Sequence, residues 1–198
     1  MIILKIVDNE YVIELIEKIT NTEIWYKSSE SYLGYNEGID LLFETFLKHK
    51  KQKSKLFFVG NGGSAAIASH MTADFMKNGG MNTYSLYNCA VTTCMGNDYG
   101  YEYIFSRQLD YLLGVGDLLV AISSSGNSLN ILNAVKTAKE KNATIITFTG
   151  FEANNKVRQM GDVNVYVPCK KYGIVESVHN LMLQQIVDLI AEKEGSKC

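Results

Sequence analysis

The residues best suited to bind a ligand stand in a short stretch rich in glycine, which consists of Asn61, Gly62, Gly63 and Ser64. An apolar run of strand length (56–59) precedes this stretch, and an alanine-rich segment that favours a helix follows it. Glycine allows a ligand to approach the backbone closely. The unpaired N–H groups and the positive dipole end of a helix start bind anions, most often phosphate. The sequence therefore predicts a phosphate-binding turn at this point.

A second stretch repeats the same arrangement and consists of Ser123, Ser124, Ser125, Gly126, Asn127 and Ser128. It follows the apolar run 117–122 and precedes a segment with helical character at 129–141. Capping of that helix is the simpler explanation, but a cap needs only one of these side chains. The surplus of hydroxyl groups favours a second phosphate-binding turn over capping alone.

Both stretches lie in a chain in which expected strands and helices alternate. We expect strands at 56–59, 82–87, 117–122, 143–149 and 163–167, and helices at 64–78, 103–113, 129–141, 155–160 and 172–194. Such alternation predicts an α/β fold, a three-layer α/β/α sandwich with a mainly parallel, Rossmann-like sheet whose ligands bind at the carboxyl ends of the strands. We predict one domain over 1–198, with a helical extension (1–52) and an α/β core (53–198). Residues 8–50 are expected to form helices around a polar break at 28–36.

Composition excludes several kinds of partner. The net charge is −2 and the pI is about 5.9, without a basic cluster, so we expect no nucleic-acid partner. No apolar run approaches the roughly 18 residues that span a membrane, and the apolar start at 1–8 is too short for a signal sequence. We therefore expect a cytoplasmic protein without a membrane partner.

A dinucleotide site is the main alternative for the first turn, because Gly60, Gly62 and Ala65 fit the spacing G-x-G-x-x-A. That site also needs an acidic residue at the end of the next strand to bind a ribose. Tyr87, which has no carboxylate, ends the expected strand, and no Walker A lysine is present. We therefore expect no nucleotide cofactor.

Three motifs together resemble the SIS (sugar isomerase) domain, and within it the phosphoheptose isomerases. They are the stretches 60–64, 96–100 and 122–128, of which the second, expected to be a loop, contains Asn97 and Asp98. The resemblance implies conversion of sedoheptulose 7-phosphate to D-glycero-D-manno-heptose 7-phosphate for bacterial lipopolysaccharide, capsule or S-layer glycans. It also implies a homotetramer with active sites at subunit interfaces. The implied substrate contacts are Asn61, Gly62, Gly63, Asn97, Asp98, Ser123, Ser124, Ser125 and Ser128.

The isomerisation moves a proton between neighbouring carbons through an enediol, so it needs a base and a group that polarises the oxygens. In the family the base is a glutamate that stands four residues after a histidine. Here these positions hold His70 and Asp74, which share one face of a helix. A histidine buried in the core is the structural alternative for His70. The aspartate one turn further along favours a functional role.

The last expected helix departs from the family. In the family this helix carries a glutamine and a histidine, which bind metal in several members. The corresponding residues here are Glu176 and Gln184. His179 is a further candidate for proton transfer. For Glu176 and His179, a solvated or interface position is equally compatible with the sequence. The family resemblance implies one divalent metal, zinc in the family, whose ligands here would be His70, Asp74, Glu176 and Gln184.

Two hypotheses follow. In the first, the chain is a phosphosugar aldose–ketose isomerase with Asp74 as the base, assisted by Glu176, His179 or Gln184. In the second, it is a non-catalytic SIS protein that binds a sugar phosphate or regulates another protein, as one relative binds the replication initiator. The carboxylate of Asp74 favours the first hypothesis, and Gln184 in place of histidine favours the second.

Overall fold

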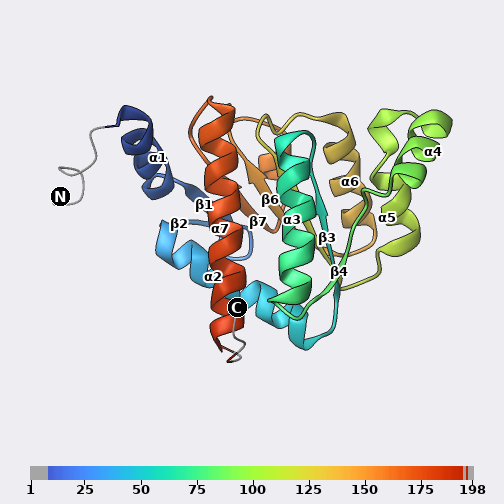
Figure 1. Ribbon diagram of the computed structural model, residues 1–198, viewed down its shortest axis with the longest axis horizontal. Coiled ribbons are helices and arrows are strands. Elements are labelled where there is room, and N and C mark those ends of the chain that lie inside the picture. The colour runs from blue at the N-terminus through green and yellow to red at the C-terminus, as the bar shows by residue number, and fades with distance from the viewer. Residues whose placement is uncertain (1–8, 194, 196–198) are drawn as a thin grey trace.

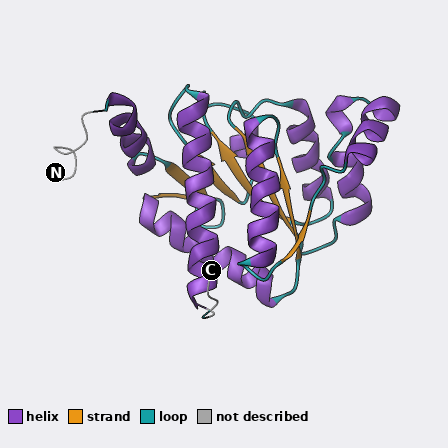
Figure 2. Cartoon of the chain, viewed as in Figure 1, coloured by secondary structure: helices purple, strands orange, loops and turns teal. Residues whose placement is uncertain are grey.

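A seven-stranded sheet with helices on both faces forms the centre of the computed structural model, which describes residues 9–193 and 195 (Figure 1 and Figure 2). The strand order is β2-β1-β7-β6-β5-β3-β4. Five neighbouring strands are parallel, namely β3 (Lys55–Val59), β4 (Asn82–Tyr84), β5 (Leu118–Ser123), β6 (Thr144–Thr149) and β7 (Val163–Tyr166). The pair β1 (Glu23–Tyr26) and β2 (Ser31–Leu33) continues the sheet in antiparallel pairing on β7.

The helices form the two outer layers. On one face lie α2 (Tyr35–Lys51), α3 (Gly63–Lys77) and α7 (Tyr172–Lys193), and α1 (Glu10–Thr20) packs on α7. The other face is covered by α5 (Ser106–Leu112) and α6 (Leu129–Glu140). The side chains of β3 alternate between the layers, since Phe58 packs with α3 and α7 and Phe57 packs on the opposite side. This arrangement confirms the expected three-layer α/β fold.

The expectation that residues 8–50 are helical is wrong in part. Residue 8 lies outside the described residues, and the strands β1 and β2 stand between α1 and α2. Pairing with β7 creates this hairpin, because Ile24 is fully buried opposite Val165. A strand of four residues that depends on a partner far along the chain has too little local periodicity to be detected.

The expectation of a loop at 96–100 is also wrong, because residues 96–99 belong to the helix α4 (Cys89–Tyr99). The side chain of Asn88 accepts a hydrogen bond from the backbone N–H of Val91 and caps this helix. A one-turn helix, η2 (Tyr101–Tyr103), follows and precedes α5. Another one-turn helix, η3 (Val157–Gln159), lies between β6 and β7 within the expected helical segment 155–160. Strand β4 ends at Tyr84, earlier than expected.

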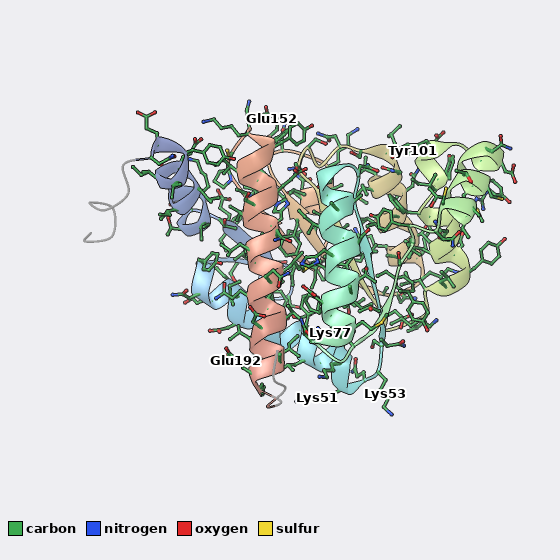
Figure 3. The ribbon with its side chains drawn as sticks, viewed as in Figure 1. Lys51, Lys53, Lys77, Tyr101, Glu152 and Glu192 are labelled. Atoms are coloured by element: carbon green, nitrogen blue, oxygen red, sulfur yellow. The ribbon has the colours of Figure 1, made fainter. Side chains whose placement is uncertain are left out.

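The carboxyl ends of the parallel strands lie along one edge of the molecule. In Figure 3, Glu152 (which follows β6) and Tyr101 are labelled along the upper edge, whereas Lys53 (which precedes β3) is labelled near the lower edge. The apolar start at residues 1–8 and Glu194, the expected last residue of the final helix, lie outside the described residues. None of the described helices is long and apolar enough to cross a membrane.

Candidate active site

The two predicted phosphate-binding turns meet in one pocket. Strands β3 and β5 are parallel neighbours, so the turns that lead from them into α3 and α6 lie side by side at the carboxyl edge of the sheet. The cavity there measures about 420 Å³. Its lining residues are Asn61, Gly62, Gly63, Ser64, Ser123, Ser124, Ser125, Ser128, Tyr172 and Glu176. The two turns thus line one cavity.

Both helix starts leave their hydrogen-bond donors available in the described part of the chain. Gly62 precedes α3 with a positive φ of 55° and provides no side-chain cap. Ser128 precedes α6, and its hydroxyl makes no capping hydrogen bond. The hydroxyl of Ser124 is buried, and no described residue offers it a partner. A buried hydroxyl without a partner is costly, so this atom is suited to bond with a ligand. Capping alone does not explain these side chains.

Buried contacts hold the glycine turn in place. A Cβ atom at Gly60 would lie 2.5 Å from the backbone oxygen of Ser64, so only glycine fits there. The hydroxyl of Tyr87 accepts a hydrogen bond from the N–H of Gly60 at 2.7 Å and donates to its carbonyl oxygen at 2.9 Å. Burial raises the pKa of Tyr87 far above its ordinary value, so the hydroxyl keeps the proton that it donates.

The side chain of Asn61 bonds to protein rather than standing free. Its carboxamide exchanges two hydrogen bonds of 2.8 Å with the carboxamide of Asn130, the second residue of α6. The hydroxyl of Tyr101 donates a third hydrogen bond, of 3.1 Å, to the oxygen of Asn61. Asn61 lines the pocket, but these bonds engage its oxygen and one of its amide hydrogens.

Glu176 brings a carboxylate into the pocket from the first turns of α7. A Cβ atom at Gly63 would lie 2.2 Å from Oε2 of Glu176, so this carboxylate rests against the start of α3. Burial raises the pKa of Glu176 above the ordinary value of a glutamate. Carboxylates are stabilised near a helix N-terminus, and this one stands beside the predicted phosphate position.

His70, Asp74 and Gln184 form a separate cluster where α3 and α7 pack together. Nε2 of His70 lies 3.2 Å from Oδ2 of Asp74. Nε2 of Gln184 donates to Asp74 at 2.7 Å and lies 2.8 Å from Nε2 of His70. The side chain of His70 is about half exposed, so a core role for this histidine is excluded. The two helices thus bring three of the four expected metal ligands together.

The fourth expected ligand, Glu176, stands elsewhere. It precedes Gln184 by eight residues on α7, which corresponds to about 12 Å along the helix. Among the described residues, no group of three or more histidine, cysteine, aspartate or glutamate side chains could hold a metal ion. The expected set of four ligands is therefore not assembled within one chain.

The cluster of His70, Asp74 and Gln184 nevertheless has a donor set that fits a divalent cation. A flip of the Gln184 carboxamide would place its oxygen where its nitrogen now lies, beside Nε2 of His70 and Oδ2 of Asp74. Nitrogen and oxygen donors of this kind suit zinc and other divalent ions of the first transition row. Any such ion would need further ligands from water, substrate or another subunit.

The structure does not support a catalytic role for His179. Its ring is fully buried, with Nε2 3.1 Å from the backbone oxygen of Thr149 and an edge contact to Phe148. Burial lowers the pKa of His179 to about 4. The ring belongs to the core between α7 and the sheet and has no access to the pocket.

Three expected binding residues do not line the pocket. Asn97 and Asp98 lie exposed in the last turn of α4, where the amide of Asn97 donates to the carboxylate of Asp98. The amide of Asn127 donates to the carbonyl oxygen of Ser125, so this side chain stabilises the serine turn. The helix α4 was not expected, and it directs Asn97 and Asp98 into solvent in this chain.

The structure adds residues that the sequence patterns did not identify as part of the site. Tyr172 lines the pocket, Tyr87 supports the glycine turn, and Asn130 and Tyr101 bond to Asn61. None of them belongs to a recognisable spacing pattern. Only Tyr101 could have been suspected, because it directly follows the stretch 96–100.

Comparison with known proteins agrees with this geometry. The SIS domain family model matches residues 31–150. The phosphoheptose isomerase of Sulfurimonas denitrificans is 34% identical over 191 residues, which cover 93% of this chain and 95% of the relative.

Two solved structures of phosphoheptose isomerases also match the chain. The one from Neisseria gonorrhoeae has a TM-score of 0.72 and 33% identity, covering 79% of this chain and 86% of that one. The one from Francisella tularensis has a TM-score of 0.78 and 25% identity, covering 93% and 96%. The chain therefore belongs to the SIS-domain family and, within it, to the phosphoheptose isomerases.

Proposed function

We propose that this chain isomerises sedoheptulose 7-phosphate to D-glycero-D-manno-heptose 7-phosphate and so supplies heptose for bacterial glycans. Its family supports an aldose–ketose isomerase. The observation that carries the proposal is that two helix starts without side-chain caps meet in one pocket with the hydroxyl of Ser124, which has no partner among the described residues. This pocket is suited to the phosphoryl group of the substrate.

The length of the substrate matches the distance between the pocket and the cluster of His70, Asp74 and Gln184. In an extended seven-carbon chain the reacting carbons lie about 9 Å from the phosphorus. Seven residues separate Gly63 from His70, which corresponds to about 10 Å along α3. The carboxylate of Asp74 reaches back one turn to His70. A phosphate at the start of α3 would thus place the far end of the sugar near Asp74.

We assign the proton transfer to Asp74, which takes a proton from the hydroxyl-bearing carbon beside the carbonyl and returns it to the former carbonyl carbon. The hydroxyl proton of the first carbon passes to the former carbonyl oxygen, which completes the isomerisation. Glu176 stands beside the phosphate end, so we assign it to the substrate hydroxyl groups there. The amide of Gln184 donates to Asp74 and fixes the orientation of its carboxylate. With its carboxamide flipped, Gln184 would instead share with His70 and Asp74 in holding a divalent cation, which would supply a Lewis acid that polarises the substrate oxygens.

Incubation with sedoheptulose 7-phosphate in deuterated water tests this function directly. We expect deuterium to enter the product when the enzyme catalyses the enediol step. The variant Asp74→Asn should lose this exchange by about 100-fold or more while it still binds the sugar phosphate. The matched control Asp40→Asn changes an exposed aspartate of α2 and should leave exchange unchanged.

The same experiment distinguishes the non-catalytic alternative. A native protein whose melting temperature rises with the sugar phosphate, but which exchanges no proton, would be a binding protein and not an isomerase. Full exchange in Asp74→Asn would instead exclude Asp74 as the base.

We also propose that the protein is a cytoplasmic homotetramer with its active sites at subunit interfaces. Two exposed apolar side chains support this assembly, Met76 on α3 and Leu181 on α7. Both helices also carry the cluster of His70, Asp74 and Gln184. Light scattering coupled to size exclusion should give four times the chain mass of 22.1 kDa. A monomer at micromolar concentration would contradict the assembly.

A further inference from the structure

A reciprocal pair of carboxamides connects the two phosphate-binding turns. Asn61 belongs to the turn before α3, and Asn130 lies in the first turn of α6, two residues after Ser128. Each side chain donates one hydrogen bond to the other, and both bonds are 2.8 Å long. Asn130 is 2% exposed, so solvent does not compete for these bonds.

The pair lies where backbone pairing has ended. The ladder between β3 and β5 stops at the pair of Val59 and Ala121. Beyond this pair the strands β3 and β5 lead into different helices, and hydrogen bonds between the strands no longer hold the two turns together. A bond between the turns is needed there, because the donors of both helix starts must point at the same phosphoryl group.

We propose that Asn130 is a positioning residue that, through Asn61, fixes the start of α6 relative to the start of α3. This inference rests on the phosphate site of the proposed function. It revises the expected role of Asn61 as a substrate contact, since the Asn61 oxygen accepts from both Asn130 and Tyr101. Through Tyr101, the segment that follows α4 also bonds to the glycine turn.

The test compares two asparagines of α6. The variant Asn130→Leu keeps a side chain of similar shape and removes both bonds to Asn61. The matched control Asn133→Leu is on the same helix. It removes one hydrogen bond, which the side-chain amide of Asn133 donates to the carbonyl oxygen of Glu102. Calorimetric titration with sedoheptulose 7-phosphate and with inorganic phosphate should show about tenfold weaker binding for Asn130→Leu. Binding to Asn133→Leu should stay within about twofold of the native protein.

A double-mutant cycle separates positioning from general stability. In an Asn61→Ala background, Asn130→Leu should cause no further loss of affinity, because Asn130 acts through Asn61. An undiminished tenfold loss in that background, or unchanged affinity in the single variant, overturns the inference. Thermal melts verify that each variant folds, and Asn130→Ala replaces the leucine variant if that one does not.

The outcomes also separate this inference from the proposed function. Native protein that binds the sugar phosphate and is weakened by Asn130→Leu, but exchanges no deuterium, refutes only the isomerase activity. Exchange with equal affinity in native protein and Asn130→Leu refutes only the positioning role. Absence of binding of both probes to the native protein overturns both.

Discussion

Replacement of Ser124 by alanine should change stability and ligand binding in opposite directions. The hydroxyl of Ser124 is buried and has no partner among the described residues, while the residue itself is 4% exposed. A buried polar group without a hydrogen bond costs about 1–3 kcal/mol. Removing it should therefore stabilise the free protein by about 1 kcal/mol, which raises the melting temperature by about 2–4 °C for a chain of this size.

Binding should suffer from the same substitution. A hydrogen bond to a charged group contributes about 1.5–3 kcal/mol, and each 1.4 kcal/mol changes an equilibrium constant tenfold. If the Ser124 hydroxyl donates to the phosphoryl group, Ser124→Ala should bind sedoheptulose 7-phosphate about 10- to 150-fold more weakly. Scanning calorimetry of the free protein and calorimetric titration with the ligand measure the two effects independently.

Ser106→Ala is the matched control. Ser106 is similarly buried, but its hydroxyl donates to the carbonyl oxygen of Tyr103 and lies outside the pocket. We expect this variant to lower the melting temperature and to leave affinity unchanged. A Ser124→Ala protein that binds the sugar phosphate as tightly as the native protein would refute the assignment of this hydroxyl to the phosphate.

Three further predictions concern the supports of the site and the core. Tyr87→Phe leaves the N–H and carbonyl of Gly60 without their buried partner. Urea unfolding should therefore show that the free energy of unfolding falls by about 2–4 kcal/mol, and a change below about 0.5 kcal/mol would contradict this. Burial lowers the pKa of His179 from 6.5 to about 4, so the unfolded chain alone takes up this proton as pH falls from 6.5 to 4. Stability should therefore decrease by up to about 3 kcal/mol across that window, and an equally steep decrease in His179→Gln would exclude this cause. Gly63→Ala places a Cβ against the carboxylate of Glu176, so turnover should fall about tenfold or more. The double variant Gly63→Ala with Glu176→Ala should turn over no more slowly than Glu176→Ala alone. Additive losses in the double variant would refute the contact.

Local sequence was sufficient to predict the centre of the fold and the two turns that line the pocket. An apolar strand that ends at small residues before a helix is a local pattern, and it occurs twice, at 56–64 and 117–128. Since the strands β3 and β5 are parallel neighbours, these patterns also place the two turns together. The pairing of His70 with Asp74 follows from helical spacing in the same way.

Features that depend on distant partners could not be predicted. The strand β1 forms because Ile24 packs into the core beside β7, and four residues carry no periodicity that reveals this. The stretch 96–100 contains glycine and asparagine, which favour a loop, yet residues 96–99 form the end of the helix α4, which begins after its capping residue Asn88. Spacing on a helix places His179 near Glu176, but only packing shows that its ring points into the core.

The most direct test of the account is a crystal structure of the protein with sedoheptulose 7-phosphate. We predict that one phosphoryl group accepts hydrogen bonds from the hydroxyl of Ser124 and from the backbone N–H of Gly63, with the opposite end of the sugar directed toward Asp74. A phosphoryl group bound to only one of the two turns, or a sugar directed away from the α3–α7 pair, would contradict the account.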